Sequence, residues 1–149
     1  MLNAGLAIDW YNESHREAVL CLFDDNTPTH FHPDERVILE QFLSEQARVY
    51  HVVLDGDHVV AAFGLSHDGQ GRGRIVWFMA HPHWHGQGLG RMMIERLREQ
   101  AVEKCVRTID IAASHRSEAF YAHFGAKTES RTEHGWGKDM HRVDMVWEI

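Results

Sequence analysis

Cysteine, positive charge and long apolar runs are all scarce in this chain of 149 residues. Two cysteines, Cys21 and Cys105, cannot make a disulfide framework, and both lie in patterns typical of buried positions. No apolar run approaches the roughly 18 residues of a membrane-spanning helix, which excludes such a span. The start of the chain, residues 1–6, lacks the features of a secretion signal, so we expect a cytoplasmic protein.

The charge balance argues against nucleic acid as a partner. Lys and Arg number 15 against 22 Asp and Glu, which gives a net charge of −7 with histidine counted as neutral. The length and the 44% of hydrophobic residues fit a globular protein with one domain over residues 1–149. What the chain does have in abundance is histidine, with 13 residues that include clusters at 30–32 and 81–85.

Apolar periodicity and turn residues predict alternating strands and helices. Strands are expected at 6–10, 49–54, 59–65, 74–80, 108–113, 127–131 and 142–148. Helices are expected from the cap Asn12 to 23, from Pro33 with Val37, Ile38, Phe42 and Ala47 on one side, at 91–104, and at 117–124 before Gly125. Asp55-Gly56-Asp57 and the glycine-rich 68–73 are expected to be hairpin turns. This order predicts an α/β sandwich on a mixed sheet.

The segment 85–90, His-Gly-Gln-Gly-Leu-Gly, carries the strongest chemical signal. It stands between an expected strand and an expected helix, and its alternating glycines let backbone N–H groups converge without Cβ clashes. The positive end of the helix dipole adds to them, so the junction suits a phosphate-type anion. The alternative is a tight glycine turn at a helix start.

Two familiar phosphate loops do not fit this segment. A dinucleotide fingerprint, G-x-G-x-x-G, would need glycine at position 91 or 93, where Arg91 and Met93 stand. A nucleoside-triphosphate loop needs Gly-Lys-Ser/Thr, but Gly90 is followed by Arg91 and Met92.

Segment 85–90 resembles instead the Q/R-x-x-G-x-G/A motif of the GNAT superfamily of acyl-CoA-dependent N-acetyltransferases, and Ala80-His81-Pro82 looks like the strand end before that motif. Segment 114–126, 24 residues beyond Gly90, is similar to the family's Asn/Ser…Phe-Tyr-x-x-x-Gly-Phe segment. His85 replaces the usual Gln or Arg, and Ala126 the usual Phe. The resemblance implies a GNAT-like mixed, mostly antiparallel sheet of about seven strands flanked by about four helices.

The resemblance also implies acetyl-CoA as cosubstrate. The backbone of Phe78, Met79 and Ala80 would pair with the pantetheine arm as an added strand. Around the pyrophosphate the resemblance places His85, Gly86, Gln87, Gly88, Leu89, Gly90 and Arg91, chiefly through the amides of residues 86–91. Ser114 matches a position that touches the cofactor. The alternative for Arg91 is an exposed charge on the helix, and the alternative for Ser114 is a cap of the short helix that follows it.

Tyr121 is the catalytic residue that the resemblance implies. Acetyl transfer to a primary amine by direct attack in a ternary complex expels a CoA thiolate, which a nearby phenol can protonate, while strand amides stabilise the oxyanion. The alternative is a core aromatic beside Phe120 and Phe124. The general base is left open between His81, another residue and water.

The acceptor amine is expected between the loop after the first helix and the loop joining the last two strands. Asp24, Asp25 and Asp139 would favour a cationic amine there, and Trp136 would cover its apolar part. Solvated loop charge is the alternative. The acceptor's identity and the acyl chain stay open, and a homodimer is compatible with the family.

Two other function classes are weighed. A metal-binding protein would use His81, His83 and His85 at alternate positions, but Pro82 and the glycines interrupt that geometry, so no metal is expected. A non-catalytic acyl-CoA-binding module would not need Tyr121.

Overall fold

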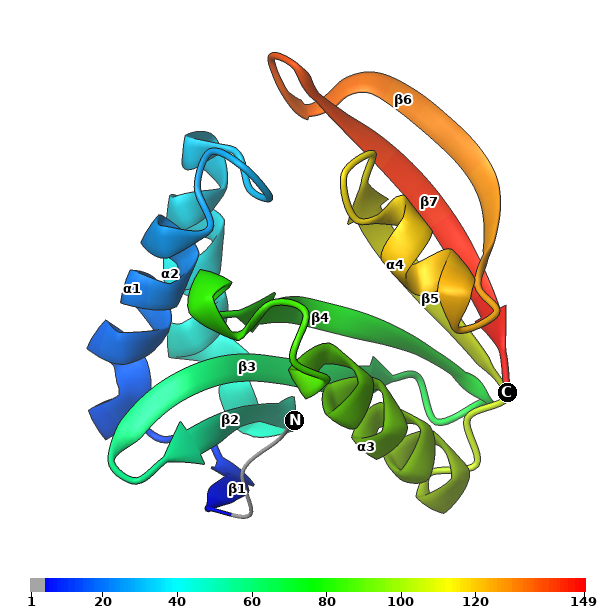
Figure 1. Cartoon of the computed structure of the whole chain (residues 1–149). Helices are drawn as coiled ribbons and strands as arrows, with labels where there is room; N and C mark the ends of the chain where they lie inside the picture. The colour runs from blue at the N-terminus through cyan, green and yellow to red at the C-terminus, as the bar shows by residue number, and fades with distance from the viewer. Residues whose placement is uncertain (1–4) are drawn as a thin grey trace.

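Within residues 5–149, which the computed structural model describes, the chain forms one seven-stranded sheet and four α-helices (Figure 1). The expectation about a secretion signal rested largely on residues 1–4, which lie outside the described part. The strands are β1 (Leu6–Trp10), β2 (Tyr50–Asp55), β3 (His58–His67), β4 (Arg72–Ala80), β5 (Thr108–Ser114), β6 (Lys127–Gly137) and β7 (Met140–Glu148). The helices are α1 (Arg16–Asp25), α2 (Arg36–Glu45), α3 (Leu89–Glu103) and α4 (Glu118–His123).

The sheet is mixed, as expected. Its strand order is β1-β2-β3-β4-β5-β7-β6, and every neighbouring pair is antiparallel except β4 and β5, which are parallel. The predicted hairpin turn between β2 and β3 is confirmed, with Gly56 at a φ of +60°. None of the described helices is long and apolar enough to cross a membrane.

Two apolar clusters pack on opposite faces of the sheet. One joins α1 and α2 to side chains of β2, β3 and the end of β4, and the other joins α3 and α4 to side chains of β2, β3, β4, β5 and β7 (Figure 1). The predicted four-residue repeat of α3 is confirmed, since Leu89, Met93, Leu97 and Ala101 are all fully buried. Burial of a leucine contributes about 1.5–3 kcal/mol, so this face fixes the position of α3 on the sheet.

The predicted inner face of α2 is partly wrong. Val37 and Ile38 are 66% and 54% exposed, whereas Leu39, Phe42 and Leu43 are buried. Spacings of three and four residues place 39, 42 and 43 on one stripe. Positions 37 and 38 fall outside this stripe, so their apolar character does not reflect core packing against the sheet.

Both cysteines are exposed, contrary to the expectation of burial. Cys21 lies on α1 between buried Leu20 and Leu22, on the helix side that faces away from the core. Cys105 lies in the turn after α3 at a φ of +56°, and the neighbouring Val106 enters the core in its place.

Strands β4 and β5 pair only where they begin. The parallel ladder covers Arg72 to Arg74 of β4 and then stops, although both strands continue. Beyond it the strands diverge (Figure 1). Arg72 closes the paired end by donating from Nε and Nη2 to the Asp110 carboxylate, each at 2.7 Å, and this pairing lowers the pKa of Asp110. The sheet is therefore split along its centre.

Candidate active site

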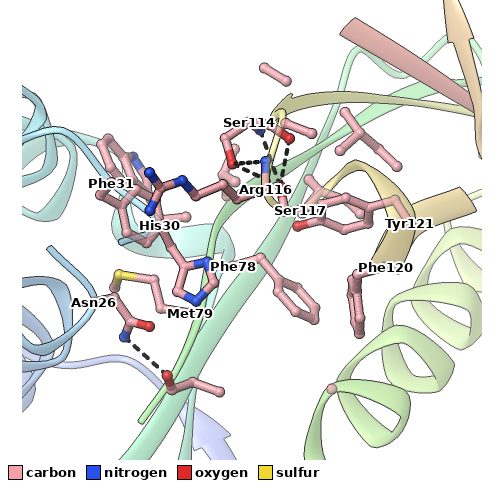
Figure 2. A pocket seen from close by; sticks show the side chains of 18 of the residues that line it. Asn26, His30, Phe31, Phe78, Met79, Ser114, Arg116, Ser117, Phe120 and Tyr121 are labelled. Carbon is pink, nitrogen blue, oxygen red and sulfur yellow. Dashed lines mark hydrogen bonds between the residues drawn. The ribbon is translucent and has the colours of Figure 1, made fainter. Parts of the chain in front are cut away.

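A cleft of about 630 Å³ occupies the opening between β4 and β5. Its walls come from the α1–α2 connection, the diverging part of β4, the segment before α3, the end of β5, and α4 (Figure 2). Of the residues predicted to bind cofactor or catalyse, eight line the cleft: Phe78, Met79, Ala80, His85, Gly86, Gly90, Ser114 and Tyr121. Gln87, Gly88, Leu89 and Arg91 are not part of the lining.

The glycine segment presents unoccupied backbone donors. Gly86 and Gly88 have φ values of +77° and +86°, a region where glycine is favoured because it has no Cβ. Gly88 is the N-cap of α3, and no side chain among the described residues caps that helix. The first helical bond runs from the Met92 N–H to the Gly88 carbonyl, so the N–H groups of residues 89–91 have no helical partner. Such an arrangement suits an anion.

Gly90 also allows α3 and α4 to meet. A Cβ at this position would lie 2.8 Å from Cε1 and 3.0 Å from Cζ of Phe120. Phe120 in turn packs against Phe78 of β4, with ring centroids 5.6 Å apart. The glycine segment, α4 and β4 are therefore in contact at the cleft.

The side chains of the segment point away from an anion held by the amides. His85 places Nε2 3.0 Å from the Ala80 carbonyl oxygen, and Gln87 donates from Nε2 to the His83 carbonyl. Arg91 approaches Nε2 of His123 at 3.3 Å and lies over the ring of Phe124. In this arrangement, the hydrogen bonds that the segment can donate to a phosphate come from the main chain.

Strand β4 carries a bulge beside the cleft. Met79 pairs with Ala62 and Val76 with Gly64, so Trp77 and Phe78 together stand opposite the single residue Phe63. Trp77 has a φ of +42°, and its carbonyl accepts a 2.5 Å hydrogen bond from the buried Tyr50 hydroxyl. Bulges interrupt the regular ladder and redirect backbone groups, and they are frequent next to active sites.

The carbonyl of Ala80, at the end of β4, already has two partners. Nδ2 of Asn26 donates to it at 3.0 Å (Figure 2), and Nε2 of the His85 ring also lies 3.0 Å from it. Asn26 is 3% exposed and also donates to the Leu22 carbonyl. A ligand strand along β4 would thus bond chiefly to groups other than this carbonyl. Asn26 was not anticipated from the sequence, because an asparagine after a helix is usually a simple cap.

Tyr121 lies on α4 with its hydroxyl directed into the cleft (Figure 2). The residue is 7% exposed, and its ring packs against Phe78 and Phe120, with centroids 5.8 and 5.1 Å away. Burial raises the pKa of the phenol, and within residues 5–149 the hydroxyl has no hydrogen-bond partner. A protonated, unengaged phenol is therefore available to a bound molecule.

Ser114 is engaged within the turn that leads into α4. Its Oγ accepts from the Arg116 N–H at 3.2 Å and lies 3.4 Å from Oγ of Ser117 (Figure 2). The N-cap of α4 is Ser117, so Ser114 is not the helix cap of the alternative interpretation and instead stabilises the turn before the helix. Because Ser114 also lines the cleft, a contact with a ligand is compatible with this role.

His30 and Arg116 are prominent in the cleft and were not singled out from the sequence. They face each other from opposite walls, with the Arg116 guanidinium beside His30 and Phe31 (Figure 2). Burial, then the charges of His85 and Arg116, lower the pKa of His30. The rings of His30 and His85 pack edge to face at 5.3 Å. The sequence shows the cluster of histidines at 30–32, but it does not show that His30 lies beside His85 and Arg116 in the fold.

The acidic residues expected to hold the acceptor do not line the cleft, so that expectation is wrong. Asp24 forms an ion pair with Arg36, with Oδ1 and Nε 3.0 Å apart. Oδ2 of Asp25 lies 3.6 Å from Nε2 of His81, and Asp139 lies in the β6–β7 turn. All three carboxylates are exposed, which matches the alternative of solvated loop charge.

The expected loop between the last two strands is mostly strand. β6 extends to Gly137 and β7 begins at Met140, so only a two-residue turn separates them. Trp136 does line the cleft, but its Nε1 donates to the Ala113 carbonyl and the Arg142 guanidinium lies over its ring, 4.8 Å from the centroid.

His81 lies outside the cleft lining. Its Nδ1 accepts from the His83 N–H, and its ring packs against that of His83 at 4.7 Å. In the described part of the chain no group of three or more His, Cys, Asp or Glu side chains is arranged to hold a metal ion. Among the described residues, the histidines that line the cleft are His30 and His85.

The split sheet, the uncapped glycine-rich helix start beside it and the tyrosine on α4 together define an acyltransferase of the GNAT type. A family model confirms the class: the acetyltransferase (GNAT) family matches residues 8–126. The chain belongs to this family. Comparison with curated proteins gives no match.

Solved structures confirm the fold. The ribosomal-protein-S18-alanine N-acetyltransferase from Escherichia coli superposes with a TM-score of 0.79 at 15% identity, covering 97% of this chain and 94% of that one. An aminoglycoside 6'-N-acetyltransferase complexed with coenzyme A gives 0.75 at 13% identity, covering 95% and 96%. N-acetylglutamate synthase from Neisseria gonorrhoeae, complexed with coenzyme A and N-acetyl-glutamate, gives 0.74 at 13% identity; this chain is covered to 99% but spans only 36% of that protein.

Proposed function

We propose that the protein transfers an acetyl group from acetyl-CoA to a primary amine by direct attack within a ternary complex. The observation that carries this proposal is the unengaged Tyr121 hydroxyl, directed into the same cleft that the uncapped start of α3 adjoins. The backbone N–H groups that would bind the cofactor and the hydroxyl that would donate a proton thus adjoin the same cleft. Coenzyme A in two of the similar structures supports the choice of cofactor. A single domain over residues 1–149, a cytoplasmic location and a homodimer remain predictions.

The residues present fit coenzyme A. The N–H groups of residues 86–91 would hold the pyrophosphate, because those of residues 89–91 are free donors at the positive end of the α3 dipole; the Gln87 N–H donates to the Trp84 carbonyl at 3.4 Å in this arrangement. The pantetheine arm would follow β4 through backbone groups of Phe78 to Ala80, on the side where β5 has diverged. The bound cofactor supplies the activated acetyl group.

The remaining chemistry belongs to side chains and amides of this chain. Backbone N–H groups near the bulge of β4 would stabilise the oxyanion of the tetrahedral intermediate. The Tyr121 hydroxyl would give its proton to the departing thiolate, and its raised pKa keeps that proton in place at neutral pH.

His30 would take the proton from the attacking amine. The amine must be neutral to attack, and His30 is an imidazole in the cleft whose pKa is lowered by burial, so it is unprotonated at neutral pH. His81, considered from the sequence, lies outside the lining, and relay through water is the alternative.

A thiol-release assay with acetyl-CoA and a library of amines tests this function. We expect amine-dependent release of free CoA, and one N-acetylated product per thiol by mass spectrometry. Binding of CoA without turnover on any amine would instead support the non-catalytic module, and the acyltransferase proposal would fail.

A further inference from the structure

The charged side chains that line the cleft are mainly cationic. Within residues 5–149 the lining contains Arg74, Arg116 and Arg142 but only one carboxylate, that of Glu35. Glu35 is 6% exposed, its Oε2 accepts the His32 N–H, and burial raises its pKa. Because the whole chain has a net charge of −7, this positive lining is a local feature that favours an anionic group.

Arg116 is the arginine among these three that has no carboxylate partner among the described residues and also lies away from the paired end of β4 and β5. Arg142 is paired with Asp144, with Nη2 and Oδ1 3.0 Å apart, and covers a tryptophan ring. Arg74 belongs to the closed end of the split, where β4 still pairs with β5 and where its charge helps to lower the pKa of Asp110. Arg116 donates only to the Thr29 carbonyl at 3.2 Å and toward the His115 ring at 3.4 Å. Among the described residues it has no carboxylate partner.

The position of Arg116 places this unpaired charge at the acceptor side of the cleft. Its side chain extends from the β5–α4 connection to the α1–α2 connection, while the start of α3, with the free N–H groups of residues 89–91, belongs to the opposite helix layer (Figure 1). The guanidinium lies beside His30, which we assign as the base. An anionic group on Arg116 would therefore belong to a molecule whose amine is only a few bonds away.

Building on the proposed acetyltransferase activity, we propose that the acceptor is an α-amino acid whose carboxylate is bound by Arg116. A planar guanidinium can take both carboxylate oxygens and so orient the molecule as well as hold it. The neighbouring α-amine then faces His30. An amine without a carboxylate leaves the guanidinium without its partner in the cleft and binds more weakly.

The test compares each common α-amino acid with its own amide as acceptor, at saturating acetyl-CoA. We expect kcat/KM to be roughly tenfold or more higher for the acid, the ratio given by one charge-assisted contact. Arg116→Gln should remove this preference by raising the KM of the acid, with the KM of acetyl-CoA unchanged, and Arg116→Lys should restore part of it. Arg96→Gln, which alters an exposed arginine on α3 paired with Glu99, is the matched control and should keep the preference.

Three results would overturn the inference. Equal turnover of acids and amides by the unmodified protein would show that the carboxylate is not recognised. A rise in the KM of acetyl-CoA in Arg116→Gln, with the acceptor KM unchanged, would assign the guanidinium to a cofactor phosphate. Absence of turnover with every acid, amide and simple amine would contradict the proposed function as well, so the two failures are distinguishable.

Discussion

Tyr121→Phe should reduce activity without reducing stability. The substitution removes one oxygen, and since the hydroxyl has no partner within residues 5–149, no hydrogen bond is lost. The ring keeps its contacts with Phe78 and Phe120. We expect the free energy of unfolding to change by less than about 0.5 kcal/mol, because the hydroxyl faces the cleft (Figure 2) and its removal breaks no hydrogen bond among the described residues.

Tyr50→Phe is the matched control for stability. The Tyr50 hydroxyl is fully buried and donates to the Trp77 carbonyl, so its removal leaves a buried acceptor unsatisfied. That loss should cost about 1–3 kcal/mol. The same chemical change thus has different consequences for stability at the two tyrosines, which urea denaturation of both variants can resolve.

The activity of Tyr121→Phe follows from the role of a general acid. Such groups contribute roughly 10²- to 10⁴-fold to rate, and leaving-group assistance by water recovers part of it, so kcat should fall at least about tenfold. The affinity for CoA, measured by calorimetry, should change less than about twofold because the main chain provides the grip. An unchanged kcat would refute the assignment, and a stability loss equal to that of Tyr50→Phe would refute the reasoning about an unengaged hydroxyl.

Three further predictions concern residues around the cleft and the core. His51 is 4% exposed, and burial lowers its pKa from 6.5 to about 4. As the pH falls from 6.5 to 4, the unfolded chain therefore binds a proton at this residue before the folded chain does, and the free energy of unfolding should drop by about 3 kcal/mol. His51→Phe should flatten this pH dependence in urea melts. Gly90→Ala should lower the free energy of unfolding by about 1–3 kcal/mol because the added Cβ clashes with Phe120, and the higher helix propensity of alanine should offset up to ~1 kcal/mol of this loss. The variant should also have a lower kcat because α4 shifts, and a fully active variant would contradict the contact. His30→Gln should lower kcat and remove the acidic limb of the pH–rate profile, which for the parent protein lies below 6.5 because burial lowers the pKa of His30; an unchanged limb would point to another base.

Most of the fold could be predicted because local pattern and tertiary packing agree. The four-residue repeat of α3 and the glycine turn at Gly56 each determine one structure, and both occur as expected. The errors lie where apolar character has no packing role. Ile38 and Cys21 look like core residues, yet their neighbours on the helix take the buried positions, and only the orientation of each helix on the sheet decides which stripe faces inward.

The candidate site was predictable only in part, for a related reason. Backbone features such as the donors around Gly86 and Gly88 are encoded locally, so the glycine spacing reveals them. Side-chain contacts are not encoded locally. His85 turns back to the Ala80 carbonyl, and Asn26 reaches the same oxygen from 54 positions away in the chain. Neither contact leaves a recognisable pattern in the sequence.

The sign of the charge in the cleft depends on such distant contacts. Asp24 lies only two positions before the cleft residue Asn26, but it forms an ion pair with Arg36 and does not line the cleft. Arg116, in contrast, enters the cleft from the β5–α4 connection and bonds to Thr29, 87 positions away in the chain. The α1–α2 connection thus supplies a carbonyl that orients the arginine, while the split between β4 and β5 gives it room. If acceptor choice resides in this contact, relatives with the same glycine segment but a neutral residue at position 116 should accept amines without a carboxylate. The cofactor grip and the acceptor preference would then vary independently, because different layers of the fold provide them.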